Sequence, residues 1–216
     1  MSKTNRILPD TPWKAQSVWS LERKSLIMLL FGLAWFWVGE AMLVLANLGA
    51  TPWAVFAQGL AQQFDVNIGV TTFLISVGVM LLWMPLHLRV GLGTLANMVV
   101  IALVFGLVVK FVPAPSAESW FLRGILCVGG VVVIGVAATL YLTCHMGAGP
   151  RDGLMVGLCH KTGWRVGVVR TLLESTVCGV GWLFGGTVGL GTLLFAFGVG
   201  WVVQFCLLFL ERWFAK

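Results

Sequence analysis

Charged residues are scarce in this chain of 216 residues: they make up 10% of it, whereas 59% of the residues are hydrophobic. A soluble domain has about a quarter of its residues charged, which is enough to cover its surface. The composition therefore excludes a water-soluble globular protein and predicts that lipid covers much of the exterior. The 27 glycines and 11 tryptophans agree, because glycine lets transmembrane helices pack closely and tryptophan anchors them at the interface.

Signatures of metal, redox and hydrolytic chemistry are missing as well. The sequence has no C-x-x-C, H-E-x-x-H or G-x-S-x-G motif, and it lacks the N-P-A motif of aquaporins. We therefore predict that the protein is not an enzyme and holds no metal and no cofactor. The five cysteines are interpreted as small packing residues in or near apolar segments. They are Cys127, Cys144, Cys159, Cys178 and Cys206.

Apolar runs of about 20 residues are long enough to cross a bilayer. Two further segments, 51–64 and 150–162, are too short to cross. Residues 1–25 are polar and lead into a full-length apolar run, so we expect a cytoplasmic arm on the membrane surface and not a signal peptide. The runs predict an all-α polytopic fold with six spans, at 26–47, 67–86, 93–111, 123–146, 166–185 and 191–211.

The sequence repeats itself when it is shifted by 98 residues. Gly49-Ala-Thr-Pro52 then falls on Gly147-Ala-Gly-Pro150, and Val90-Gly-Leu-Gly-Thr-Leu95 falls on Val188-Gly-Leu-Gly-Thr-Leu193, without a gap. Apolar bias alone does not align two such motifs at one offset. We therefore predict a duplication.

Each copy has one long helix, one short segment and two further helices, with the first repeat at 26–111 and the second at 123–211. Because three spans is an odd number, the copies must enter the membrane in opposite orientations. The positive charges agree, since segment 51–64 has no Lys or Arg and its copy has two. The +6 formal charge thus reports topology and not nucleic-acid binding, and both termini are predicted to be cytoplasmic.

The short segments each begin with a Gly-x-x-Pro motif. Gly49 and Pro52 in one copy, and Gly147 and Pro150 in the other, provide a flexible residue and then a residue suited to the first helical turn. Two readings remain open. The segments are either half-helices that dip into the membrane, whose free amide groups can hold an anion, or interfacial helices that lie flat on the two surfaces.

The second repeated motif precedes the third helix of each copy. Gly91 and Gly93 allow a sharp turn, and Thr94 is suited to an N-cap. We expect a tight structural turn, because two glycines and a threonine do not make a phosphate-binding loop. The equivalent residues in the second copy are Gly189, Gly191 and Thr192.

Charged residues within the spans are functional candidates, because burying an unpaired charge in a membrane is costly. Glu40 lies about 14 residues into the first span, roughly 21 Å along it. Glu174 lies near the middle of the fifth span, and Arg170 precedes it by one turn on the same face. The structural alternatives are an ion pair that ties helices together and, for Glu40, a hydrogen bond to a neighbouring helix.

Two further polar residues belong to this set. Asp152 lies at the beginning of the second short segment, where a carboxylate favours a helix N-terminus. His145 ends the fourth span and is either a titrating group or a polar helix end. Neither Glu40 nor Glu174 has an acidic counterpart in the other copy, so the predicted site is asymmetric on a symmetric scaffold.

Three motifs, in order, resemble a known family. Gly147-Ala-Gly-Pro-Arg-Asp-Gly-Leu-Met-Val-Gly-Leu158, Val169-Arg-Thr-Leu-Leu-Glu174 and Gly185-Gly-Thr-Val-Gly-Leu-Gly-Thr192 resemble the YczE-like branch of the YczE/YyaS/YitT family of bacterial membrane proteins. The resemblance covers residues 29–208 and implies a protein of the bacterial cytoplasmic membrane. The family's first motif reads G-x-x-P-W-D, whereas Ala54 stands at the position of that acid here.

These observations favour a small secondary transporter or facilitator of a small, anionic solute. In that reading Glu40 and Glu174 bind a proton or the substrate, and Arg170 contacts the anion. The alternatives are a channel and a non-transporting scaffold whose arm, residues 1–25, docks a cytoplasmic partner. The expected partners are the lipid bilayer and an unidentified small molecule or ion, and no nucleic acid. Assembly of identical copies is left open.

Overall fold

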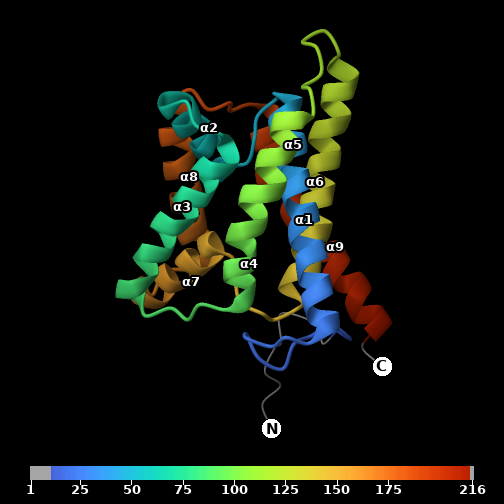
Figure 1. Cartoon of the computed structure of the whole chain (residues 1–216), viewed down its shortest axis with the longest axis vertical. Helices are drawn as coiled ribbons and strands as arrows, with labels where there is room; N and C mark the ends of the chain where they lie inside the picture. The colour runs from blue at the N-terminus through green and yellow to red at the C-terminus, as the bar shows by residue number, and fades with distance from the viewer. Residues whose placement is uncertain (1–10, 215–216) are drawn as a thin grey trace.

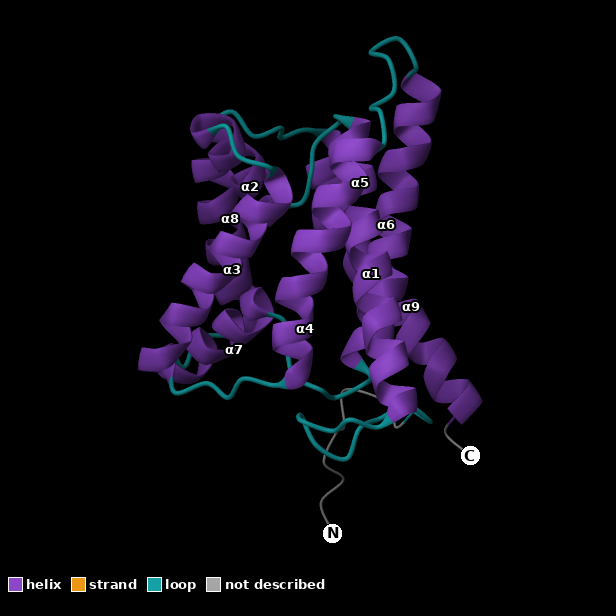
Figure 2. Ribbon diagram, viewed as in Figure 1, coloured by secondary structure: helices purple, strands orange, loops and turns teal. Residues whose placement is uncertain are grey.

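The computed structural model describes residues 11–214, apart from the side chains of residues 166 and 167. This part of the chain is helical and contains no β-strand (Figures 1 and 2). In chain order the α-helices are α1 (Arg23–Ala46), α2 (Pro52–Phe64), α3 (Ile68–Trp83), α4 (Leu92–Val100), α5 (Gly106–Phe111), α6 (Trp120–Leu142), α7 (Pro150–Thr162), α8 (Val166–Leu183) and α9 (Leu190–Phe214).

Five helical stretches in the described residues are long and apolar enough to cross a membrane. The all-α class of membrane protein is therefore confirmed. The remaining predicted span corresponds to α8, which has 18 residues and carries two charges. Helix α6 ends earlier than the predicted span 123–146, because the chain turns after Leu142. The five stretches are Arg23–Ala46, Ile68–Leu86, Leu92–Phe111, Trp120–Leu142 and Leu190–Phe214.

The backbone repeats with the same 98-residue offset as the sequence. Helices α7, α8 and α9 begin 98 residues after α2, α3 and α4, respectively. The eight described residues with positive φ also form four pairs at this offset, so the two copies turn at equivalent places. The pairs are Asn47 and His145, Gly49 and Gly147, Asp65 and Gly163, and His87 and Gly185.

The helices form two groups with a cavity between them. Helices α1, α6 and α9 pack together on one side, and α2, α3, α7 and α8 lie on the other, with the α4–α5 stretch beside α1 (Figure 1). Glycines bring helix axes close: a Cβ on Gly39 of α1 would lie 2.9 Å from the Gly130 oxygen of α6. Helices α2 and α7 lie at opposite ends of the molecule (Figure 1).

The repeated G-L-G-T motif of the first copy holds the loop before the short helix of the second copy. The Gly93 amide donates to the Met146 oxygen at 2.8 Å, and Thr94 Oγ1 donates to the Ala148 oxygen at 2.7 Å. A Cβ on Gly91 would lie 2.5 Å from the same Met146 oxygen, which explains the glycine. The N-cap residue of α4 is Gly91 and not Thr94, but Thr94 still takes part in capping, because its Oγ1 accepts from the Gly91 amide at 3.3 Å while it donates to the other repeat.

The second copy makes the same clamp in return. The Gly191 amide donates to the Leu48 oxygen at 2.8 Å, and Thr192 Oγ1 donates to the Ala50 oxygen at 2.8 Å. The turn predicted at Gly189 is present, and the helix begins at the next residue. The two loops that lead into the short helices are thus each positioned by the opposite repeat.

The predicted third span is a continuous helical stretch with an irregular centre. A π-helical turn at Ile101–Phe105 joins α4 to α5, where a regular helix was expected. Helix α3 packs against this turn: a Cβ on Gly69 would lie 2.6 Å from Gly106 Cα and 2.8 Å from the Ala102 oxygen. The wider turn therefore lies where the backbones of α3 and the α4–α5 stretch make close contact.

The described part of the N-terminal arm is fastened to the helices. Thr11 Oγ1 donates to the Thr143 oxygen at 3.2 Å, and Trp13 Nε1 donates to Thr143 Oγ1 at 3.0 Å. The Leu92 amide donates to the Val18 oxygen at 2.9 Å. The arm thus connects the end of α6 with the start of α4, and the part of the predicted arm at positions 1–10 lies outside the described residues.

Candidate functional site

The beginnings of α2 and α7 face one cavity of about 250 Å³ between the two groups of helices. Pro52 and Pro150 occupy the first positions of these helices, as the Gly-x-x-Pro motifs predict. Gly49 and Gly147 precede them with φ of 114° and 107°, conformations that favour glycine. Because a helix leaves its first amide groups unpaired, two partially positive helix ends meet at the cavity.

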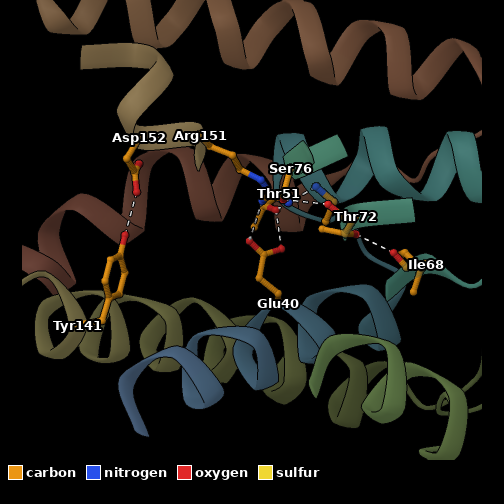
Figure 3. A network of polar contacts seen from close by, with 9 residues as sticks. Glu40, Thr51, Ile68, Thr72, Ser76, Tyr141, Arg151 and Asp152 are labelled. Carbon is orange, nitrogen blue, oxygen red and sulfur yellow. Dashed lines mark hydrogen bonds and ion pairs between the residues drawn. The ribbon is translucent and has the colours of Figure 1, made fainter. Parts of the chain in front are cut away.

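Glu40 lies at the cavity wall and is 2% exposed. Thr51 Oγ1 donates a hydrogen bond of 2.7 Å to Glu40 Oε2, and Thr51 also caps α2 by accepting from the Ala54 amide (Figure 3). Arg151 Nη1 lies 4.0 Å from Glu40 Oε1. The hydrogen bond to another helix was one of the two predicted roles of Glu40, and the cavity position is compatible with the other.

Arg151 lies in the first turn of α7 and reaches the centre of the site. Its guanidinium carbon lies 5.1 Å from the ring centroid of Trp37 and 5.3 Å from that of Trp53. Such stacking stabilises a cation in a poorly hydrated place. Arg151 Nη2 has no hydrogen-bond partner in the described part of the chain.

Asp152 follows in the same turn and faces α6. Its Oδ2 accepts a hydrogen bond of 2.8 Å from the Tyr141 hydroxyl (Figure 3). Asp152 therefore has the predicted place near a helix N-terminus, and it also ties α7 to α6 across the cavity.

Arg170 and Glu174 form the predicted i,i+4 ion pair on α8, with Arg170 Nε 2.8 Å from Glu174 Oε1. Both residues line the cavity, and their side chains are 50% and 24% exposed. Four of the five predicted binding residues, Glu40, Asp152, Arg170 and Glu174, thus lie at one cavity.

His145 is the fifth predicted candidate, and the structure places it elsewhere. It is not among the described residues that line the cavity. It lies in the turn after α6 with φ of 56°, the equivalent of Asn47 in the first copy. This position matches the alternative reading, a polar helix end.

The G-L-G-T residues do not form an anion site either, since their groups bind backbone oxygens of the opposite repeat. In residues 11–214, outside the undescribed side chains, no cluster of three or more His, Cys, Asp and Glu side chains could hold a metal ion.

Sequence reasoning missed Arg151, which was counted only as one of the two positive charges in segment 150–162. The repeat contains the signal that could have identified it. Arg151 follows Pro150 by one residue, and its equivalent in the first copy is Trp53. The two equivalent residues stack on each other at the centre of the molecule. Tyr141 and Trp37 gave no such signal, because aromatic residues are common in membrane helices.

The long apolar helices and the charged cavity between them define a polytopic membrane protein. The chain belongs to a family described as "Family of unknown function (DUF6198)", whose model matches residues 23–207.

Two relatives support the YczE-like assignment. A protein of Haemophilus influenzae with the name "Uncharacterized protein" is 50% identical over 212 residues, 98% of this chain and 96% of the relative. The "Uncharacterized membrane protein YczE" of Bacillus subtilis is 34% identical over 192 residues, 88% of this chain and 85% of the relative. The resemblance to the YczE-like branch is therefore confirmed. No solved structure matches the chain.

Proposed function

We propose that this protein is a small secondary transporter or facilitator that moves a small anionic solute across the bacterial cytoplasmic membrane. The observation that carries the proposal is the convergence of two helix N-termini and Arg151 on one cavity. Free amide groups at helix ends bind anions, and transporters with inverted repeats place such ends at the membrane midplane.

The proposal includes a topology. Helices α2 and α7 are re-entrant half-helices in opposite leaflets, α8 is the sixth span, and both termini are cytoplasmic. Three features support this arrangement: the 98-residue backbone repeat, the positions of α2 and α7 at opposite ends of the molecule (Figure 1), and the absence of Lys and Arg from α2. Irregular backbone at membrane depth is tolerated where it lines a cavity.

In the proposed mechanism Arg151 binds the anionic group of the solute. The 4.0 Å separation from Glu40 is longer than a charge-assisted hydrogen bond, so Glu40 neutralises part of the charge and leaves a donor for the solute. Glu40 and Glu174 are the groups that would exchange a proton during the cycle. Arg170 would attract the anion at the cavity wall.

The test is flux into proteoliposomes that contain the purified full chain, with a pH-sensitive dye inside. Chloride, phosphate, acetate and methanesulfonate are applied in turn. We expect a saturable flux of at least one anion, reduced about tenfold or more by Arg151→Gln, since a hydrogen bond to a charged group contributes about 1.5–3 kcal/mol. Unchanged flux in both Glu40→Gln and Glu174→Gln would remove the proton-binding role, and no flux of any anion would remove the transporter proposal.

The scaffold alternative has less support. Residues 11–22 of the arm are bonded to the protein's own helices, through Trp13 and Val18 among others, and this leaves less of the arm to dock a partner. A channel differs from a carrier in its flux, which would not saturate over the same concentration range. That the protein is not an enzyme stays a prediction.

A further inference from the structure

Two of the helices that line the cavity are not packed against each other. Helix α8 packs against α2 and α7, and α9 packs against α6, but α8 and α9 do not form a packed pair. Figure 2 shows α8 with α2, α3 and α7, and α9 with α1 and α6 on the other side of the molecule. Residues of both helices nevertheless line the cavity: Arg170, Leu173 and Glu174 of α8, and Phe195, Val199, Gly200 and Val203 of α9.

Gly200 marks the mouth of this gap. It lines the cavity and is itself exposed, as a residue at an opening of the cavity would be. A Cβ on Gly200 would meet nothing within 4 Å. Helix α9 begins at Leu190, so Gly200 lies roughly 15 Å along the helix at the usual rise per residue.

The depth of Gly200 in the membrane determines which solutes can enter the cavity there. In a helix of 25 residues that crosses a bilayer, a residue 15 Å from the end lies among the lipid tails. An opening at this level faces lipid and not water. A solute that uses it must therefore have an apolar part that partitions into the bilayer.

The interior of the cavity fits a molecule with one anionic end. Its wall next to the gap is apolar, with Leu173, Phe195 and Val199 among the lining residues. Trp37 and Arg151 also line the cavity, and each has a buried donor without a hydrogen-bond partner among the described residues: Trp37 Nε1, on a residue that is only 2% exposed, and Arg151 Nη2. Buried donors are rarely left unpaired, so both point to a ligand that supplies an acceptor.

We infer that the gap between α8 and α9 is a lateral portal through which an amphipathic organic anion enters the cavity from the bilayer. Its anionic group binds Arg151 and Trp37, and its apolar tail lies against the wall next to α9. Arg170, half-exposed at the mouth, attracts the anionic group first. The inference rests on the proposed function and adds the substrate class and the route.

Three probes separate charge from apolarity: octanesulfonate, which stays charged and does not cross a bilayer as a neutral acid, methanesulfonate, which has the same head without the tail, and octanol, which has the tail without the charge. Binding to the full chain in detergent is measured by calorimetry. We expect octanesulfonate to bind at least tenfold more tightly than either other probe, and Arg151→Gln to weaken it about tenfold or more. Arg165→Gln is the matched control, since Arg165 is exposed and does not line the cavity.

The portal itself is tested by Gly200→Trp, which puts a large side chain into the mouth. The matched control is Gly179→Trp on α8, where an added Cβ also meets nothing within 4 Å and which is not a lining residue. In lipid nanodiscs we expect Gly200→Trp to slow octanesulfonate association at least tenfold and the control to leave it unchanged. Equal rates in the two variants would overturn the portal.

Other results distinguish this inference from the proposed function. Flux of methanesulfonate without binding of octanesulfonate would overturn the inference and leave the transporter standing. Binding of octanesulfonate through the portal without flux of any probe would support the inference and remove transport. If Gly200→Trp dissociates an oligomer in light scattering, a second copy covers the gap and the portal is wrong.

Discussion

Two helix pairs with equivalent sequences pack differently in this molecule. In the first repeat α3 packs against the α4–α5 stretch, whereas in the second repeat α8 and α9 do not form a packed pair. The two pairs differ at several positions of the repeat, and one of these positions lies at the closest contact of the first pair. Gly69 and Gly106 make the close contact in the first copy, and shifting by 98 residues places Gln204 at the position of Gly106. The larger residue at this position is one difference between the side of the cavity that is packed and the side that is not.

The largest effect is expected from Gly106→Gln, which gives the first copy the residue of the second. A Cβ here would lie 2.8 Å from Asn67 Oδ1 and 3.1 Å from Gly69 Cα, so α3 must move away. Overpacking of this kind costs about 1–3 kcal/mol, and we expect the upper end because backbone is involved. Thermal unfolding in detergent checks this, with Gly78→Gln on the exposed face of α3 as the control. Equal melting temperatures in the two variants would contradict the explanation.

A smaller effect is expected from the clamps, which are alike in the two repeats. Thr94→Val and Thr192→Val each remove one hydrogen bond to a backbone oxygen of the opposite copy, at 2.7 and 2.8 Å. Each substitution should lower stability by about 1–3 kcal/mol, the cost of an unpaired buried group. The two losses should agree, because the clamps share one geometry. Conservative Thr→Ser substitutions at the same positions, which keep the hydroxyl, serve as controls in the same unfolding assay.

A modest effect is expected from Gln204→Ala, which puts a small residue at the position equivalent to Gly106. The smaller side chain should let α9 approach α8 and narrow the gap. Because Gln204 is exposed, we expect the free energy of unfolding to change by under about 1 kcal/mol. The measurement is the rate at which a maleimide labels Gly200→Cys in this background. Labelling should be slower than in Gln204→Leu, which keeps the bulk. Faster labelling would show that residue size does not hold the gap open.

The smallest effect on stability is expected from Arg170→Gln. The Arg170–Glu174 pair lies within one helix and Arg170 is 50% exposed, so its loss should cost under about 0.5 kcal/mol. Octanesulfonate association should slow in this variant, because the charge at the mouth is lost. A large drop in melting temperature would instead assign the pair a structural role.

Much of the fold could be predicted from local signals. The apolar runs located the spans within a few residues, and the Gly-x-x-Pro motifs located α2 and α7, because proline in the first turn and glycine at positive φ act on their own neighbourhood. The π-helical turn at Ile101–Phe105 could not be predicted, since α3 packs against that segment and its residues are ordinary helix formers.

The candidate site divides in the same way. Glu40 and Glu174 could be identified from the sequence, because a charged residue within an apolar run is costly to bury and can be recognised without knowledge of the fold. The partners of Glu40 were hidden: Thr51 and Arg151 belong to two different short helices and reach it only after both repeats have folded.

By itself the sequence determined that the protein lies in a membrane and, within a few residues, where the long helices begin, and it predicted the duplication, because hydrophobicity and turn chemistry are properties of short segments. Only the tertiary structure decided that each half binds the loop of the other, that Arg151 rather than His145 lines the cavity, and that α8 and α9 do not pack against each other. These features depend on how residues that are distant in sequence pack against one another, and neighbouring residues do not specify this.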